Sequence, residues 1–451
     1  MTNKKTLKGL VQLGNKADII KLISNKKVLI WGARMTGIGA LRQLKNNNID
    51  VLGFVDSDVA FNGKFSQGLK VYNPNELKNI LDDREDVVIL VAVALKESEI
   101  LSQLNKLEIP KIPVLSFYDE NAPYYTVDIL SSCNLKCASC PHSIEETDVP
   151  KGSMTLETFK SVFDKVMEDS PATSHISLYS WGEPLLHPYL SKIIDYVHKR
   201  NVAVALSSNL SIKFRSRLDK IIQSNPDSLK VSLSGFYPDA YNNTHQGGDI
   251  DLVKANLILI RELIDKYNSN TLVDINYHLY KDNSGINIDE MEKFADNLGF
   301  VVSKTYALVM PLERVISHVE GKPDLQTKLL EDNLLVTIDE GIKASSKSVL
   351  PENTCPFREN QININADLSV PICCTVWQRD ENVVAKNFLE SNLEEINNNK
   401  KNVDLCNKCM KLRLPEYNMG LNKNGWEEYA KKKTITDIGS KLEQKKSINP
   451  I

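Results

Sequence analysis

The chain has 451 residues, which predicts two to four domains rather than one. With 42% hydrophobic and 25% charged residues and a formal net charge of −3, its composition is that of a globular protein and argues against a surface for nucleic acid or membranes. No apolar run is long enough to span a membrane, and the polar residues 1–9 precede no apolar signal-peptide core, so we expect a cytoplasmic protein.

After one or two helices within the first 25 residues, strands and helices alternate to about residue 120. This alternation predicts a Rossmann-like parallel αβ domain, and the uniformly apolar third strand fits a sheet covered on both faces. We expect strands at 26–33, 49–58, 86–94 and 112–119, and helices at 35–46, 73–82 and 96–107.

A second αβ series begins near residue 124. Six βα units in about 190 residues predict a partial (β/α)6 barrel of the TIM type, in which the chemistry sits at the C-terminal ends of the strands. The expected strands are 125–129, 175–180, 202–207, 229–234, 271–279 and 301–308, and the expected helices are 156–168, 188–199, 214–223, 251–265 and 288–297.

Beyond about residue 325 the pattern weakens. Residues 350–412 carry five cysteines between short polar segments, and a small region with few apolar residues often needs a metal to fold. The Lys-rich sequence from residue 420 predicts a solvated helix and a frayed end. We therefore expect domains at 1–121, 122–330 and 331–420, followed by a tail at 421–451.

The eight cysteines cluster in sequence, which in a reducing cytosol indicates metal ligands or catalytic groups rather than disulfides. Cys133, Cys137 and Cys140 follow a strand in C-x3-C-x2-C spacing. Three thiolates on one loop can bind three irons of a cubane cluster and leave the fourth iron open, whereas such clusters normally take four cysteines. A zinc site with His142 as the fourth ligand is the alternative.

On this motif the chain resembles the radical S-adenosylmethionine (SAM) superfamily. The resemblance implies that SAM occupies the open iron of a [4Fe–4S] cluster and is cleaved on reduction to a 5′-deoxyadenosyl radical, which abstracts hydrogen from a substrate. The family usually has an aromatic residue before the third cysteine, where this chain has Ser139, so the usual packing of the adenine is in doubt.

The next strand ends also resemble this family. Trp181-Gly182-Glu183-Pro184 is similar to its Gly-Gly-Glu-Pro motif, which implies that Gly182, Glu183 and Pro184 help to bind SAM. Ser207 and Asn209 end the third strand and are expected to contact the SAM carboxylate or ribose. The fourth strand and its loop also resemble a family pattern, at Ser232, Ser234, Gly235, Tyr241, His245 and Gly247. Ser234 stands in place of an Asp and His245 in place of an Arg, and we expect His245 to lie in an exposed loop.

The second cysteine region resembles the SPASM or shorter twitch extension of radical SAM enzymes, although Leu368 stands where a glycine is expected. The resemblance implies one auxiliary [4Fe–4S] cluster, fully ligated by protein and suited to electron transfer. Cys374 is then a spare, although the sequence leaves open whether it or Cys373 binds, and a four-cysteine zinc site is the alternative. The expected ligands are Cys355, Cys373, Cys406 and Cys409.

In the N-terminal unit, Gly32, Gly37 and Gly39 lie between a strand and a helix, and Asp56 ends the following strand. Such a turn can cradle a phosphate, but the G-x4-G-x-G spacing is weak evidence for a dinucleotide. The segment is similar to the N-terminal domain of bacterial sugar acyltransferases, which implies a nucleotide-sugar ligand; an αβ domain without a ligand is the alternative.

The leading interpretation is a radical SAM oxidoreductase of the dehydrogenase kind. We expect it to act on a small polar substrate, a sugar or nucleotide-sugar, with a flavodoxin- or ferredoxin-type reductant. Its general base is unidentified, with Tyr179, Glu183 and His245 as unranked candidates. The alternatives are a peptide-modifying maturase and a non-catalytic, zinc-binding interaction protein.

Overall fold

The computed structural model describes residues 10–11, 13–82, 84–93, 96–107, 109, 111–143, 152–348, 350, 353–377 and 380–433. The expectations for residues 1–9 and for the tail beyond residue 433 fall outside these ranges. Among the helices described, none is long and apolar enough to cross a membrane.

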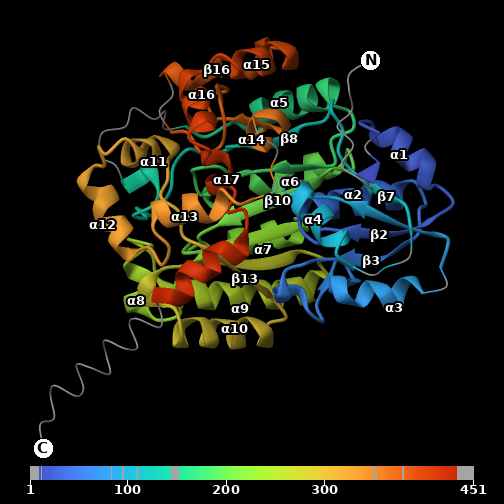
Figure 1. Ribbon diagram of the computed structural model, residues 1–451, viewed down its shortest axis with the longest axis horizontal. Coiled ribbons are helices and arrows are strands. Elements are labelled where there is room, and N and C mark those ends of the chain that lie inside the picture. Colours follow the sequence, from blue (N-terminus) through green and yellow to red (C-terminus); the bar gives the residue numbers. More distant parts are fainter. Residues whose placement is uncertain are drawn as a thin grey trace, which may run out of the picture.

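The N-terminal unit is built on a seven-stranded sheet, parallel except for its β5–β4 edge, with one apolar core on each face (Figure 1). The predicted strands and helices are confirmed, whereas β1, β4 and β5 were not expected. In sheet order the strands are β1 (Leu10–Val11), β7 (Val114–Ser116), β6 (Val87–Val91), β2 (Lys27–Trp31), β3 (Val51–Val55), β5 (Leu69–Tyr72) and β4 (Phe65–Ser66), with helices α1 (Lys16–Ile23), α2 (Met35–Asn46), α3 (Leu77–Leu81) and α4 (Glu97–Leu104).

The second sheet confirms the partial barrel, because six strands lie in chain order and all are parallel. They are β8 (Tyr124–Val127), β9 (His175–Ser177), β10 (Ala203–Ser208), β11 (Ser228–Leu233), β12 (Leu272–Leu279) and β13 (Val301–Tyr306). The connecting helices are α5 (Leu156–Asp169), α6 (Leu190–His198), α7 (Arg215–Gln223), α8 (Pro238–Asn242), α9 (Ile250–Tyr267) and α10 (Ile286–Asn297).

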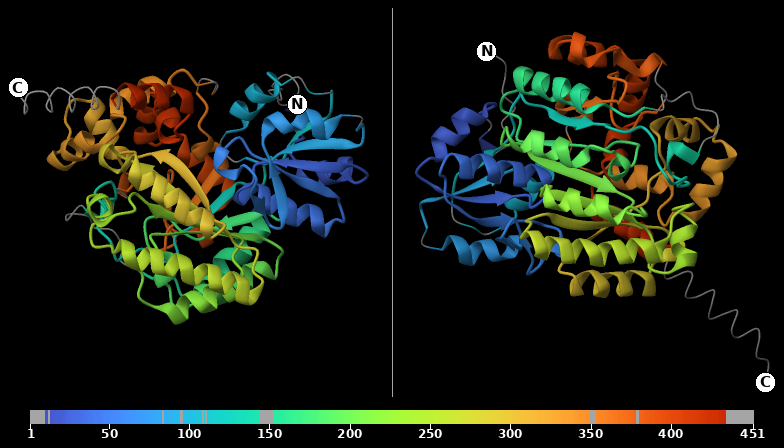
Figure 2. Two further views of the ribbon diagram at one scale, coloured as in Figure 1. Left: turned by 90° about the horizontal axis from the view of Figure 1, so that it is seen from below. Right: turned by 180° about the vertical axis from the view of Figure 1, so that it is seen from behind.

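The two faces of this sheet differ in chemistry. In β11, Leu229, Val231 and Leu233 are buried in the large apolar core, whereas the alternating Lys230 and Ser232 are only half-buried. The view from below shows the connecting helices on one side of the sheet and the C-terminal region, orange to red, on the other (Figure 2, left). The polar positions therefore face the interior of the barrel, where a substrate can bind.

The C-terminal region is mostly helical, and its strand β14 adds a seventh parallel strand beside β8. It contains α11 (Leu312–Val319), α12 (Leu325–Asn333), α13 (Ile338–Ser345), α14 (Pro356–Asn360), β14 (Gln361–Ile364), β15 (Val370–Pro371), β16 (Val383–Ala385), α15 (Leu393–Lys400), α16 (Asp404–Lys411) and α17 (Leu414–Asn418).

The helix at 423–433 is not simply solvated, and that expectation is wrong. Trp426 is 1% exposed, and its indole N–H donates to Ser345 Oγ at 3.0 Å. Gly341 lies against the Trp426 ring, where a Cβ would come within 2.8 Å of it. This helix therefore belongs to the shared core that begins at Tyr125 in β8.

The N-terminal unit docks on the end of the barrel where the strands begin. Asp227, which is buried just before β11, accepts hydrogen bonds from Arg42 Nε at 2.7 Å, from His198 Nε2 at 2.9 Å and from the Val204 backbone N–H at 2.8 Å. Gly39 of α2 lies so close to Ser174 that a Cβ would come within 2.8 Å of the Ser174 carbonyl oxygen. The opposite end, where the strands finish, stays available for chemistry.

Candidate functional site

The first three cysteines lie together on the loop that follows β8. Cys133, Cys137 and Cys140 are all half-buried and free of disulfides. This loop is fixed to the segment after β11, because Lys136 N donates to Gln246 O at 2.9 Å and Ala138 N donates to Thr244 O at 3.3 Å. The polypeptide therefore holds the three thiols in place through its own backbone.

The three thiols are buried close to one another, so they lose their protons readily only when a cation binds between them. Burial raises the pKa of Cys133 to about 11 and that of Cys140 to about 12. The pKa of Cys137 is raised by burial and then by the charges of the other two thiols, so the three lie close together. Cys133 Sγ accepts hydrogen bonds from Leu135 N at 3.4 Å and Asn209 Nδ2 at 3.6 Å. Thiolates are the ligands of iron–sulfur clusters, so this donor set fits one.

The Gly182-Glu183-Pro184 turn is packed directly against the cysteine loop. Glu183 N donates to Ser132 O at 2.9 Å, and a Cβ on Gly182 would lie 2.7 Å from the carbonyl carbon of Leu130. Glycine is therefore required here because the two loops approach so closely.

The carboxylate of Glu183 ties this turn to the end of β10. One oxygen accepts from Leu185 N at 3.0 Å and the other from Asn209 N at 2.8 Å. Burial raises the pKa of Glu183 to about 7, although these hydrogen bonds oppose the shift. Glu183 thus positions the strand ends around the cysteines.

Asn209 links the third strand end to the cysteine loop. Its side chain donates to Asn134 Oδ1 at 3.0 Å as well as to Cys133 Sγ. Ser207 is half-buried on the barrel interior, whereas Ser208 is buried and accepts from Leu210 N at 2.8 Å. The residues predicted after β8, β9 and β10 are therefore assembled at one end of the barrel.

An aromatic cluster joins this site to the second cysteine region. Trp377 packs edge-on against Trp181 at 5.8 Å and against His142 at 5.3 Å between ring centroids. His142 Nε2 donates to the Trp181 carbonyl oxygen at 3.0 Å, which makes this nitrogen a poor candidate for a zinc ligand. The sequence reasoning did not find Trp377, because only the fold brings it here.

The expectation that His245 is exposed is wrong. The residue is 7% exposed, its ring stacks on Tyr241 at 4.9 Å, and its Nδ1 lies 2.7 Å from Ser234 Oγ. Burial, together with the nearby His278, lowers the pKa of His245 to about 3, so the ring is neutral. His245 and Ser234 therefore form one buried polar pair beneath the loop that holds the cysteine segment.

The second cysteine group surrounds a small pocket. Cys406 and Cys409 lie on one face of α16, Cys355 precedes α14, and Cys373 follows β15; all four line the pocket, whereas Cys374 does not. Burial raises the pKa of Cys409, as do the charges of Cys373, Cys355 and Cys406. This arrangement brings together the four cysteines that the sequence predicts as ligands.

Two cations that the sequence did not reveal adjoin this pocket. Lys400 is 1% exposed, and its ammonium donates to Arg358 O at 3.2 Å and to Gln361 O at 2.5 Å. Burial lowers the pKa of Lys400 to about 8, an effect that the nearby thiols of Cys373 and Cys355 oppose. Arg358 itself lines the pocket. Buried positive charge here suits a group of four thiolates.

The residue in place of the expected glycine has a glycine-like backbone. Leu368 has φ of 71°, in the left-handed region, within a turn where its N–H donates to Asn365 O at 2.9 Å. The turn therefore keeps the shape that a glycine would allow, five residues before Cys373.

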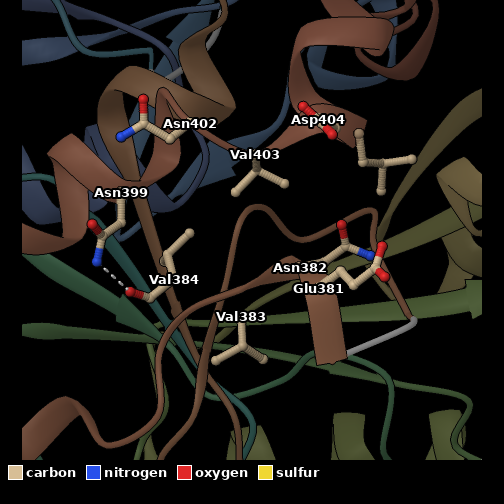
Figure 3. A pocket seen from close by; sticks show the side chains of 9 residues that line it. Glu381, Asn382, Val383, Val384, Asn399, Asn402, Val403 and Asp404 are labelled. Carbon is tan, nitrogen blue, oxygen red and sulfur yellow. Dashed lines mark hydrogen bonds between the residues drawn. The ribbon is translucent and has the colours of Figure 1, made fainter.

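A site for a single metal ion, such as zinc, needs several ligands around one point. Within the described ranges, no three side chains of His, Cys, Asp or Glu converge on one metal ion. A cubane offers a separate iron to each thiolate, so its ligands need not converge on one point. A polar hollow on the outside of the region lies over the start of α16 and is lined by groups such as Glu381, Asn399 and Asp404 (Figure 3), none of which was a predicted site residue.

The glycine turn of the N-terminal unit is closely packed. A Cβ on Gly37 would overlap the backbone of Gly32, and Asp56 accepts from Ala33 N at 3.0 Å and Asp58 N at 2.9 Å. Arg34 Nε binds Asp274 of β12 at 2.8 Å. These contacts account for the glycine at position 37 and for the acidic side chain at position 56 by packing and hydrogen bonding within the protein. Nucleotide-sugar binding remains a prediction.

Comparison with protein families tests these interpretations. The description "C2185-like, N-terminal" matches residues 24–115, and "Radical SAM superfamily" matches residues 127–282. Residues 127–282 are a radical SAM domain. It contains the first three cysteines, the Gly182-Glu183-Pro184 turn and Asn209.

Three named proteins are similar to parts of the chain. The subtilosin biosynthesis protein AlbA of Bacillus subtilis is 31% identical over 94 residues, 21% of this chain and 20% of AlbA. The AdoMet-dependent heme synthase of Methanosarcina barkeri is 25% identical over 42% of this chain and 52% of that protein. The chain thus spans a fifth of the first relative and about half of the second.

A cofactor-modifying protein of Pyrococcus furiosus, for a tungsten-containing aldehyde ferredoxin oxidoreductase, is 25% identical over 53% of this chain and 67% of its own length. Among solved structures, anSMEcpe with bound AdoMet covers 70% of this chain and 98% of itself at 17% identity and a TM-score of 0.43. Streptococcus suis SuiB bound to S-adenosylmethionine covers 66% and 68% at 11% identity and a TM-score of 0.41.

Proposed function

We propose that Cys133, Cys137 and Cys140 hold a [4Fe–4S] cluster with one iron open to SAM, and that the enzyme abstracts hydrogen from a small polar substrate, a sugar or nucleotide-sugar. The observation that carries the proposal is the packing of three half-buried thiols on one loop against the Gly182–Glu183 turn. Bound there, the cluster and SAM supply carbon-centred radical chemistry that side chains cannot provide.

The protein's own part is to position these groups. Gly182, Glu183 and Pro184 bring the turn after β9 beside the cysteines, and Asn209 presents an amide between this turn and Cys133. Ser207 faces the barrel interior from the same strand end. We assign these five residues to SAM binding. The C-terminal region lies on the other side of the sheet from the connecting helices (Figure 2), where it would shield the interior from water.

We further propose that Cys355, Cys373, Cys406 and Cys409 hold an auxiliary [4Fe–4S] cluster. Four protein ligands leave no iron open for substrate, so its role is electron transfer in an oxidoreductase reaction, with a flavodoxin- or ferredoxin-type protein as the reductant. The buried Lys400 and the adjacent Arg358 support this site because they offset the negative charge of four thiolates.

A peptide-modifying maturase is the second candidate function. It is favoured by the similarity to AlbA, a bacteriocin biosynthesis protein. The N-terminal unit argues for a different substrate, since it is an αβ sheet docked through Arg42 and Asp227 to the base of the barrel, away from the strand ends.

Metal analysis and SAM cleavage test the proposal. Protein purified without air should contain about eight irons per chain if both clusters are cubanes, and after reduction by dithionite it should release 5′-deoxyadenosine from SAM. Cys137→Ala should retain about four irons and lose SAM cleavage. Cys374→Ala, a matched thiol deletion outside both ligand sets, should retain about eight irons and cleave SAM. Zinc in place of iron, or unchanged cleavage in Cys137→Ala, would overturn it.

A further inference from the structure

The barrel interior contains one lysine whose charge is not paired. Lys230 lies on β11 at a position that points away from the helix-covered face, and it is half-buried. Among the residues that the structure describes, its ammonium forms no ion pair and donates no hydrogen bond. Its ammonium lies 5.1 Å from the ring centroid of Tyr179, an aromatic contact that leaves the positive charge uncompensated.

The carboxylate nearest in the sheet is already engaged. Asp274 is the β12 residue in register with Lys230, but it binds Arg34 Nε at 2.8 Å and Ser303 Oγ at 2.5 Å. Arg34 is also paired with Asp58, at 2.7 Å. Arg34, which enters from the base of the barrel, is therefore paired with carboxylates, whereas Lys230, one strand from Asp274, is not.

The other groups around Lys230 are neutral. Burial and then the charge of Lys230 lower the pKa of His278 to about 4, so this ring carries no charge at neutral pH. Asn276, which lies in register with Ser232, contributes an amide, 3.3 Å from His278 Nε2. The neighbours of the ammonium thus include a phenol ring, an imidazole, an amide and the thiol of Cys374, and no carboxylate of the described residues pairs with it.

The position of Lys230 is that of a substrate contact. Tyr179 lies three residues before Gly182 in the turn proposed to bind SAM, and Lys230 lies three residues before the end of β11, deeper in the barrel than that turn. An ammonium in a partly buried, neutral environment attracts an anion strongly, because little solvent screens it. Lysine serves as a point charge for phosphate or carboxylate oxygens.

We propose that Lys230 binds an anionic oxygen group of the substrate, a phosphate or carboxylate, in the barrel interior beside Tyr179 and Asn276. This inference rests on the proposed function, whose substrate it restricts to an anion. A neutral sugar would leave the ammonium unpaired, whereas a nucleotide-sugar or a sugar acid would pair with it.

Equilibrium dialysis with labelled inorganic phosphate and labelled acetate tests the proposal. The cluster-loaded full chain is used at low ionic strength with saturating SAM, so that the carboxylate of SAM is already in place. We expect one site per chain, and the stronger of the two anions identifies the group. Lys230→Met should weaken binding at least tenfold, and Lys230→Arg should retain it.

Lys304→Met is the matched control, because Lys304 lies on β13, two strands from β11 in the same sheet, but pairs with Glu292 at 2.7 Å. It should bind the anion as the wild type does. No stoichiometric site for either anion, or equal binding by Lys230→Met, would overturn the inference, as would a loss of SAM binding in that variant. Substrate-free SAM cleavage is measured in parallel: its absence in the wild type refutes the proposed function, whereas intact cleavage without an anion site refutes only the role of Lys230.

Discussion

Replacing Gly182 by alanine tests whether the turn and the cysteine loop act as one unit. A methyl group there would overlap the Leu130 carbonyl, lying 2.7 Å from its carbon and 3.2 Å from the Ser132 carbonyl oxygen. Carbon atoms ordinarily approach to about 3.5–4.0 Å and the Leu130 carbonyl oxygen lies nearer still, so one of the two loops must move by at least about 1 Å. Such overpacking costs about 1–3 kcal/mol of stability, and a 1 Å misplacement of reacting groups costs about 100-fold in rate.

We therefore expect Gly182→Ala to fold, to retain most of its iron, and to release 5′-deoxyadenosine about 100-fold more slowly than the wild type. Gly152→Ala is the control, because its methyl group would meet no heavy atom within 4 Å although Gly152 O accepts from Ser131 N of the same loop. The assay is anaerobic SAM cleavage followed by chromatography. Wild-type cleavage by Gly182→Ala would refute the close packing on which the site depends.

Three further predictions follow from the structure. Cys373→Ala should lose about four irons whereas Cys374→Ala keeps them, as iron analysis would show; the reverse would exchange their roles. Burial raises the pKa of Glu183 to about 7, so the neutral carboxyl group stabilises the fold fully below pH 4.5, and this stabilisation is lost as the pH rises through 7. The amide in the variant Glu183→Gln cannot ionise, so the free energy of unfolding of this variant should rise relative to that of the wild type by up to about 3 kcal/mol between pH 5 and 8. Urea unfolding measures this difference, and a difference that does not change with pH would contradict the prediction. Asp227→Asn should cost about 3–5 kcal/mol in the same assay by leaving buried partners unpaired, against less than about 1 kcal/mol for exposed Asp265→Asn; equal costs would contradict the docking role.

The main elements of both sheets were predictable from local patterns. Apolar runs such as 86–94 and the alternation in 229–234 mark β6 and β11, because burial on two faces or on one leaves a direct record in the sequence. Short strands such as β4 and β14 escaped prediction, since they have two and four residues and are strands only because a partner is there. The domain boundaries remain predictions, because one core continues from β8 into the C-terminal region.

Some residues of the candidate site could likewise be predicted from the sequence, and others could not. The first cysteine group could be predicted because its three members share one loop and a fixed spacing, which is local information. Trp377, Lys400 and Lys230 could not, because their roles come from contacts with segments far away in the chain. The environment of His245 was missed for the same reason: the loop that contains it is covered by the cysteine segment.

The pairing of β14 with β8 has a consequence for the order of assembly during synthesis. β8 leads directly into the cysteine loop, and Asp128 N donates to Ile364 O at 2.8 Å. Until residue 364 has left the ribosome, β8 is an unprotected outer strand with unpaired backbone groups. The loop that carries Cys133, Cys137 and Cys140 thus gains this support only when four-fifths of the polypeptide exists, so on the proposed function we expect iron to be loaded late in the life of each molecule.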